Sequence, residues 1–288
     1  MLRMIGLGRA GTRLTDLSVF ALLVFATLVA LFPIYMIALT SIKQPIDITA
    51  GGVSPFITPT ADHFLALFGV RPSEFRFDLW LHFRNTMLAA TGSTLLAILV
   101  GTPAAYAFAR VRFRGSTVGF SILLATRLLP PIATVIPLYL IMRSLGLLDT
   151  VAALILAYTT FNLPFYVLMM FSFFIDLPKE LEEAAMIDGA TRWQTFYLVM
   201  VPLCLPGLVA AAIFSLVLAW NDFIFAVILT SYNAPTLPLL VAGFVTDMGV
   251  SWGIIMAAGS IIVLPVLVFT LFAQKHMLRG LTGGAVKG

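Results

Sequence analysis

The sequence predicts an all-α integral membrane protein with six transmembrane helices and both termini in the cytoplasm. Its 288 residues are 60% hydrophobic, with a mean hydropathy of +1.04, which is more than the polar surface of a soluble domain could cover. Six apolar runs are long enough to cross a hydrocarbon core of about 30 Å. The basic residues gather in alternate connecting segments, as is typical of cytoplasmic loops.

The six apolar runs set the expected spans, at residues 17–39, 86–109, 118–142, 151–175, 203–229 and 252–273. The first run is too long for a cleaved signal sequence and no small-residue cleavage site follows it, so we expect an uncleaved helix. We expect a single transmembrane domain over residues 1–288. Its core bundle covers about 80–275, its external segment about 41–84 and its cytoplasmic tail about 275–288.

The basic residues between these spans predict the orientation. The inner side holds eleven: Arg3, Arg9, Arg13, Arg110, Arg112, Arg114, Lys179, Arg192, Lys275, Arg279 and Lys287. The outer side holds five: Lys43, Arg71, Arg76, Arg84 and Arg143. Because cytoplasmic loops carry the excess of Lys and Arg, both termini are expected inside.

Small residues recur at every fourth position of the second predicted span. They are Ala89, Ser93, Ala97, Gly101 and Ala105. This spacing places them on one helix face, where another backbone can approach closely. We therefore expect close packing at this face, either within the bundle or against a partner subunit.

Arg127 lies inside the third predicted span, about 15 Å deep at 1.5 Å per residue. An arginine at such depth costs about 2.5–3.5 kcal/mol on insertion scales, so it should face the bundle interior or a water-filled cavity. Pro130, Pro131 and Pro137 follow it, and each removes a helical hydrogen bond, which predicts a broken helix. Arg127 is either a substrate-pathway residue or the structural partner of a carboxylate on another subunit.

Three further polar residues are candidates for the substrate pathway. Asn162 lies near the midplane of the fourth span, two residues before Pro164. Asn221 and Asp222 lie toward the outer end of the fifth span, where an interfacial role is at least as well supported.

The loop between the fourth and fifth spans, residues 176–201, concentrates charge in a chain that is only 10% charged. Pro178 suits the first turn of a helix, and good helix formers follow it. Gly189 occupies the position where a left-handed residue would end that helix. Thr191 and Gln194 have the spacing of a capping box that opens a second helix. The loop should therefore form a helix–glycine–helix elbow.

Glu183-Ala184-Ala185, Gly189 and Val199-x-Val201-Pro202 resemble the EAA loop of binding-protein-dependent ABC importer permeases. In that family the pattern ends in Ile-x-Leu-Pro, so the two valines are conservative departures. The resemblance implies that the elbow is a coupling helix seated in a cytoplasmic ATPase. The residues that it assigns to ATPase coupling are Glu182, Glu183, Ala184, Ala185, Asp188, Gly189 and Ala190, together with Gly283 and Gly284 of the tail.

Two more segments narrow the resemblance to the carbohydrate-uptake branch, residues 219–231 and the tail at 274–288, which is similar to that of the maltose-type permease. The resemblance implies a second permease subunit, a dimeric cytoplasmic ATPase, an extracytoplasmic substrate-binding protein and surrounding membrane lipid as partners. The chain has no GxxxxGK[ST] run, so ATP and Mg²⁺ would be used by the partner ATPase, and no cofactor is expected on this chain. One cysteine and three scattered histidines predict no disulfide and no metal site.

The expected function is therefore that of a permease subunit, without enzymatic activity or nucleic-acid partner, in the bacterial inner membrane. It would import a sugar, a polyol or a sugar derivative by alternating access. One alternative is the same importer with another cargo, such as a polyamine or a glycerophosphate-like compound. A second is an ion-coupled secondary transporter, which would need ionisable groups at mid-membrane, where Asp222 is the one acid well inside a span.

Overall fold

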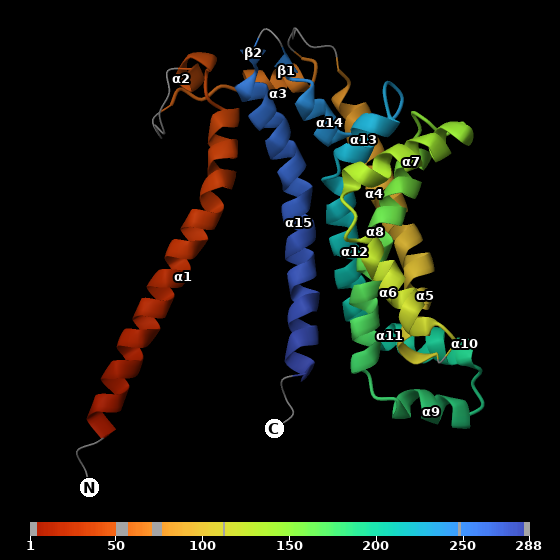
Figure 1. The fold of residues 1–288 in the computed structure, drawn as a ribbon. Helices are drawn as coiled ribbons and strands as arrows, with labels where there is room; N and C mark the ends of the chain where they lie inside the picture. The colour runs from red at the N-terminus through yellow and green to blue at the C-terminus, as the bar shows by residue number, and fades with distance from the viewer. Residues whose placement is uncertain (1–4, 50–56, 71–76, 112, 247–248, 285–288) are drawn as a thin grey trace. The chain divides into compact units, whose positions relative to one another are not determined.

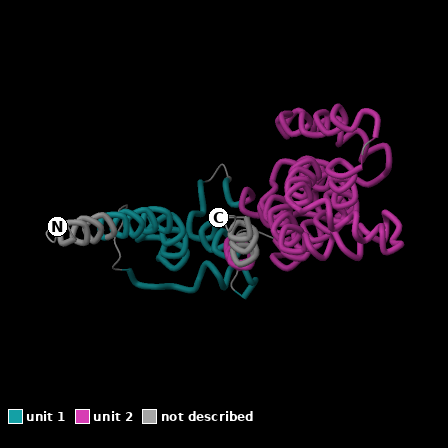
Figure 2. Tube along the Cα trace, turned by 90° about the horizontal axis from the view of Figure 1, so that it is seen from below, with its two compact units in different colours: residues 1–74, 244–261 teal, residues 75–243, 262–288 magenta. Residues whose placement is uncertain are grey.

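The computed structural model describes residues 5–49, 57–70, 77–111, 113–246 and 249–284. The chain separates into two compact units (Figure 2). Unit one comprises Met1–Glu74 and Phe244–Ile261, and unit two comprises Phe75–Gly243 and Ile262–Gly288. The long helix α15, Trp252–Gly284, contributes residues to both.

Unit one consists of a long apolar helix and a small cap. Its elements are α1 (Ile5–Ser41), α2 (Pro45–Thr49), α3 (Asp62–Leu67), the antiparallel strands β1 (Val245–Thr246) and β2 (Gly249–Val250), and the start of α15. The cap is closed by the His63 ring, whose Nε2 lies 2.9 Å from the carbonyl oxygen of Lys43. A Cβ at Gly253 would lie 2.2 Å from that ring, so a glycine is needed for α15 to approach it.

Unit two is a helical bundle around α8 (Val151–Asp176) (Figure 1). Helices α4 (Leu79–Leu96), α5 (Thr102–Arg110) and α12 (Leu205–Trp220) pack against α8. The remaining elements are the π-helices Ala97–Gly101 and Phe196–Met200 and the helices α6 (Ser116–Thr126), α7 (Pro131–Ser144), α9 (Glu180–Ile187), α10 (Arg192–Thr195), α11 (Val201–Leu203), α13 (Ile224–Leu229) and α14 (Leu237–Ala242).

The stripe of small residues on α4, the π-helix Ala97–Gly101 and α5 is buried, and the predicted close packing is confirmed. Ala89, Ala97 and Ala105 have no exposed surface, and Ser93 and Gly101 are also buried. A Cβ on Gly101 would lie 2.5 Å from the ring of Tyr166 on α8. Of the two packing arrangements that the sequence left open, the one within the bundle is therefore present.

The number of candidate membrane spans depends on how two bent helix pairs are counted. Among the described residues, four helical stretches are long and apolar enough to cross a membrane: Leu17–Ser41, Leu79–Arg110, Val151–Asp176 and Trp252–Phe272. Counting each bent pair as one span brings the number to six. These pairs are Ser116–Thr126 with Pro131–Ser144, bent by 99°, and Arg192–Leu203 with Leu205–Trp220, bent by 77°.

The predicted break in the third span is confirmed, since α6 ends at Thr126 and α7 begins at Pro131. Pro137 does not break the helix but lies inside α7. The fifth span differs from the prediction of one continuous run over residues 203–229. It is interrupted between Trp220 and Ile224, because the Asp222 carboxylate accepts a hydrogen bond from the Phe225 N–H at 3.0 Å and so starts a new helix.

The carboxylate of Asp149 joins two connecting loops of unit two by hydrogen bonds. Asp149, between α7 and α8, has a positive φ of 60°. Its oxygens accept hydrogen bonds from the backbone N–H groups of four consecutive residues, Ser231 to Ala234, the shortest being 2.8 Å. The Asn85 amide in the second turn of α4 donates to two carbonyls of the same loop, those of Asn233 and Pro235. Together these bonds connect the ends of four helices.

Candidate functional site: an anchored elbow and a cavity in the bundle

The elbow at residues 176–201 forms as predicted from its local sequence. Helix α9 spans Glu180–Ile187, with three glutamates in its first turn, where the positive end of the helix dipole favours them. It begins two residues after Pro178, so this proline precedes the helix and does not lie in its first turn as predicted. Gly189 follows with a φ of +90°. Its N–H donates to Met186 and the Ala190 N–H donates to Ala185, the pair of bonds that defines a Schellman motif.

The second arm of the elbow starts with the predicted capping box. Thr191 Oγ1 accepts a hydrogen bond from the Gln194 N–H at 3.3 Å, and Gln194 Oε1 accepts one from the Thr191 N–H at 2.8 Å. Both bonds satisfy donors that a helix start would otherwise leave unpaired. Both arms are therefore capped at the joint, and the polar backbone groups of the connecting residues are largely satisfied.

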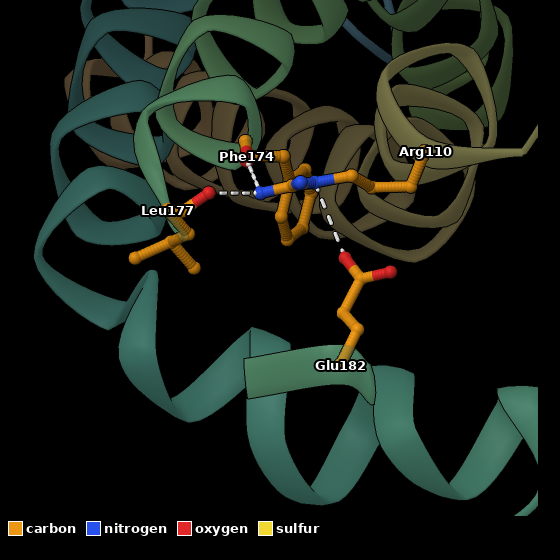
Figure 3. A network of polar contacts seen from close by, with 4 residues as sticks. All are labelled: Arg110, Phe174, Leu177 and Glu182. Atoms are coloured by element: carbon orange, nitrogen blue, oxygen red, sulfur yellow. Dashed lines mark hydrogen bonds and ion pairs between the residues drawn. The ribbon is translucent and has the colours of Figure 1, made fainter. Parts of the chain in front are cut away.

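Arg110, the last residue of α5, connects the elbow to the bundle (Figure 3). Its Nε lies 3.2 Å from Glu182 Oε1 in an ion pair whose side chains are 4% and 13% exposed. Its Nη2 donates to the carbonyls of Phe174 and Leu177, at the end of α8. Sequence reasoning counted Arg110 as one of eleven inner basic residues, and no local pattern paired it with Glu182.

The residues assigned to ATPase coupling divide into two groups in the structure. Glu183, Ala184, Asp188 and Gly189 are exposed, and Ala185 and Ala190 are partly exposed. Glu182 is mostly buried because its carboxylate turns toward Arg110. Gly283 and Gly284 end helix α15, whereas residues 285–288 of the tail lie outside the described part of the chain.

The elbow also carries exposed apolar side chains that sequence reasoning did not single out. Ile187, at the end of α9, is 85% exposed, and Trp193 on α10 is 63% exposed. The signal available in the sequence was Ile187, an apolar residue within a charged segment. Such apolar surface beside carboxylates is typical of a protein–protein contact.

An aromatic cluster lies between the elbow and the bundle. The ring of Trp193 is 5.1 Å from that of Phe196, and Phe196 is 4.9 Å from Tyr106 of α5. Tyr106 is in turn 5.5 Å from Phe174 of α8. Contacts at these distances add to the burial of the rings, so the second arm is packed onto the bundle as well as capped.

A cavity of about 410 Å³ opens among α8, α12 and α13, a size typical of small-molecule sites. It is lined by Tyr158, Phe161, Asn162, Val217, Leu218, Asn221, Asp222, Phe223, Ile224 and Phe225. Three of the four substrate-pathway candidates therefore surround one space. They come from two segments far apart in the sequence, with aromatic rings between them.

Arg127, the fourth candidate, does not line this cavity but contacts Phe161, which does. Its guanidinium lies 4.5 Å from the ring centroid of Phe161 and 5.7 Å from that of Phe165. It also donates to the Phe161 carbonyl at 3.2 Å. Within the described residues, no carboxylate is paired with it. The charge is thus stabilised by aromatic faces and a carbonyl.

Comparison with known proteins agrees with this architecture. Residues 95–283 match the family described as binding-protein-dependent transport system inner membrane component. That region contains the elbow, the Arg110 anchor and the cavity.

Two relatives and one solved structure extend the likeness over nearly the whole chain. The chain is 38% identical to the trehalose transport system permease protein SugB of Mycobacterium tuberculosis, covering 90% of this chain and 93% of that protein. It is 36% identical to the sulfoquinovosyl glycerol transport system permease protein SmoH of Agrobacterium fabrum, covering 90% and 89%. A crystal structure of a bacterial ABC transporter involved in the import of the acidic polysaccharide alginate matches 92% of this chain and 97% of its own, with 26% identity and a TM-score of 0.73.

Proposed function

This chain belongs to the family of binding-protein-dependent transport system inner membrane components, and we propose that it carries a sugar or sugar derivative into the cytoplasm as one permease subunit of an ATP-driven ABC importer. The printed functions of the relatives, trehalose and sulfoquinovosyl glycerol transport, support this cargo class. Membership in this family sets aside the ion-coupled secondary transporter. The anchored elbow is the observation that carries the proposal.

The elbow is the element through which ATP hydrolysis would drive transport. Its exposed residues Glu183, Ala184 and Ile187 would dock into a cytoplasmic ATPase dimer, which supplies ATP and Mg²⁺. Closure of the ATPases would push the elbow and switch the bundle between inward-open and outward-open packings. The glycines Gly283 and Gly284 would reach the same ATPase.

The remaining partners and the topology follow from the same proposal. A second permease subunit completes the pore, and an extracytoplasmic binding protein delivers the cargo. Each bent helix pair counts as one span, which makes six spans with both termini in the bacterial cytoplasm. The excess of basic residues on that side supports this orientation.

The cavity among α8, α12 and α13 is proposed to lie on the cargo pathway. Aromatic rings such as Phe161 and Phe223 offer flat apolar faces, while Asn162, Asn221 and Asp222 offer hydrogen-bonding groups. A sugar ring presents the matching surfaces, an apolar face of C–H groups and a rim of hydroxyls. A few polar groups in an otherwise apolar pocket are what fixes the orientation of a small ligand.

Uptake by the complete transporter in proteoliposomes tests the function. With the binding protein outside and ATP inside, we expect accumulation of one radiolabelled sugar from a panel that includes trehalose. Without ATP we expect none. Uptake that follows a proton or sodium gradient and ignores ATP would overturn the proposal.

Arg127 provides a second test of the pathway. Arg127→Ala removes the cation that holds the Phe161 ring, so we expect the transporter to assemble normally while uptake falls. Assembly is measured by co-purification of the subunits and uptake on the same preparation. If Arg127 instead paired with a partner's carboxylate, its loss would leave that charge buried and assembly would fail.

A further inference from the structure

One ion pair joins the elbow to the bundle within the described part of the chain, that of Arg110 with Glu182. Its Nε–Oε1 distance is 3.2 Å, and both side chains are largely withdrawn from solvent. Charged partners at low exposure interact more strongly than they would at the surface, because less water screens them. The pair is therefore suited to fix the orientation of α9 relative to α5.

Helix α9 meets the bundle through Glu182, which also interacts with the Tyr106 hydroxyl of α5. None of its eight residues is buried, so apolar packing does not hold it against the bundle. Its two ends continue into short connecting segments, at Leu177–Lys179 and Asp188–Ala190. A helix attached in this way can tilt about its ends unless a side chain restrains it.

The same arginine also closes the end of α8. The carbonyls of Phe174 and Leu177 lie at the helix terminus, where backbone acceptors lack intrahelical donors, and Arg110 Nη2 donates to both. The planar guanidinium can bond to carbonyls on one edge and to a carboxylate on another. One side chain thus joins α5, the end of α8 and α9, as Figure 3 shows.

We propose that Arg110 and Glu182 are positioning residues for energy coupling, which hold α9 rigidly to α5 and α8. A push on the elbow then moves the bundle and does not tilt α9 alone. Neither residue needs to touch the cargo or ATP for this role. The inference rests on the proposed function, since it presumes that an ATPase pushes the elbow.

A distance measurement between the elbow and the bundle tests the anchor. Spin labels are placed at Met186 on α9 and at Thr117 on α6, both exposed, in a Cys204→Ser background of the complete transporter in lipid nanodiscs. Double electron–electron resonance is recorded without nucleotide and with ATP plus EDTA, which prevents hydrolysis. In the otherwise unaltered protein we expect one narrow distance distribution that ATP leaves unchanged.

Glu182→Gln is the decisive variant, because it keeps the side-chain shape and removes the charge. We expect loss of the narrow distribution, an ATP-dependent shift in distance and less uptake for each ATP hydrolysed. Arg110→Met should show the same changes. Glu180→Gln is the matched control, with the same change on the same helix at an exposed position, and should leave the distribution narrow.

Two results would overturn the anchor. The first is a Glu182→Gln distribution as narrow as that of the unaltered protein. The second is a loss of assembly and thermal stability in both anchor variants with no change in distance, which is the outcome of a merely structural pair. The proposed function fails separately, if the unaltered transporter does not take up a sugar.

Discussion

At the scale of the residue, Gly189 and Asp149 show two ways in which a backbone with positive φ is used. Gly189, at +90°, ends α9 and has no atom within 4 Å of where a Cβ would be. Glycine is therefore needed at this position for its positive φ and not for lack of space. Asp149, at 60°, is an L-residue in the left-handed region and is held there by the hydrogen bonds to its carboxylate.

Gly189→Val should distort the elbow without blocking membrane insertion. A β-branched residue in the left-handed region costs about 1–2 kcal/mol, so the Schellman bonds to Ala185 and Met186 would be lost in part of the population. We expect normal levels in the membrane and reduced binding of the ATPase, measured by co-purification. Gly189→Asn is the control and should bind better than Gly189→Val, because asparagine tolerates this conformation.

The hydrogen bonds to the Asp149 carboxylate should weaken in acid. Burial alone would raise the pKa of this carboxyl, but hydrogen bonds from the backbone N–H groups of Ser231, Asn233, Tyr232 and Ala234 outweigh it and lower the pKa. A depressed folded pKa means that the stabilisation is present above the unfolded pKa and is lost as the pH falls through the folded value. Hydrogen exchange of the four amides should report this loss below about pH 4.

Two substitutions test whether the Asp149 carboxylate holds the loop. Asp149→Asn removes the charge, and we expect the four amides to exchange faster at neutral pH. Asp149→Gly relieves the positive φ and also removes the carboxylate, so the same amides should again lose protection. Protection that survives in both variants would show that the loop is held without the carboxylate.

At the scale of the element, the packing of α4 and α5 on α8 depends on side chains that are absent or small. The spacing of small residues at every fourth position predicted close packing at this face, and at Gly101 the group that comes close is the Tyr166 ring and not a backbone. The Tyr166 hydroxyl also lies 2.8 Å from Thr102 Oγ1, which leaves the ring little freedom to move. The small residues therefore determine how closely, and at which point along its length, α8 packs against this face.

Gly101→Ala should destabilise the bundle. A Cβ there would lie 2.5 Å from Tyr166 Cδ1, and overpacking of this kind typically costs about 1–3 kcal/mol. We expect a lower melting temperature of the purified protein in detergent. Gly119→Ala is the matched control, because its Cβ would meet Phe108 at an ordinary 3.6 Å and alanine favours the helix. Equal melting temperatures for the two variants would contradict the packing argument.

At the scale of the whole molecule, the proposed six-span topology would place the elbow and the loop after α13 on opposite sides of the membrane. Ile187 in the elbow is 85% exposed and Tyr232 in that loop is 87% exposed, so both positions are open to a reagent when this chain is expressed without the ATPase. In a Cys204→Ser background, a membrane-impermeant maleimide should label Tyr232→Cys in intact cells. Ile187→Cys should be labelled only after the membrane is opened. Labelling of Ile187→Cys in intact cells would reverse the orientation.

Much of the fold and part of the site could be predicted because they depend on local chemistry. Proline lacks an N–H, so the break before Pro131 could be predicted. The elbow could be predicted because glycine adopts a positive φ readily, and because threonine with glutamine three residues later caps a helix. The interruption at Asn221–Phe223 was not predicted, since the apolar run continues through it and one carboxylate bonding to a backbone N–H decides where the helix restarts.

The amino-acid sequence alone establishes the membrane class, the charge asymmetry, the elbow and the family, since each is a property of composition or of neighbouring residues. Only the tertiary structure decides that Arg110 meets Glu182, that Asn162 faces the same cavity as Asn221 and Asp222, and that Arg127 lies against Phe161. The physical reason is that membrane helices are apolar on nearly every face. Hydrophobic periodicity therefore says little about which faces meet, and shape, small residues and the few polar groups determine the packing.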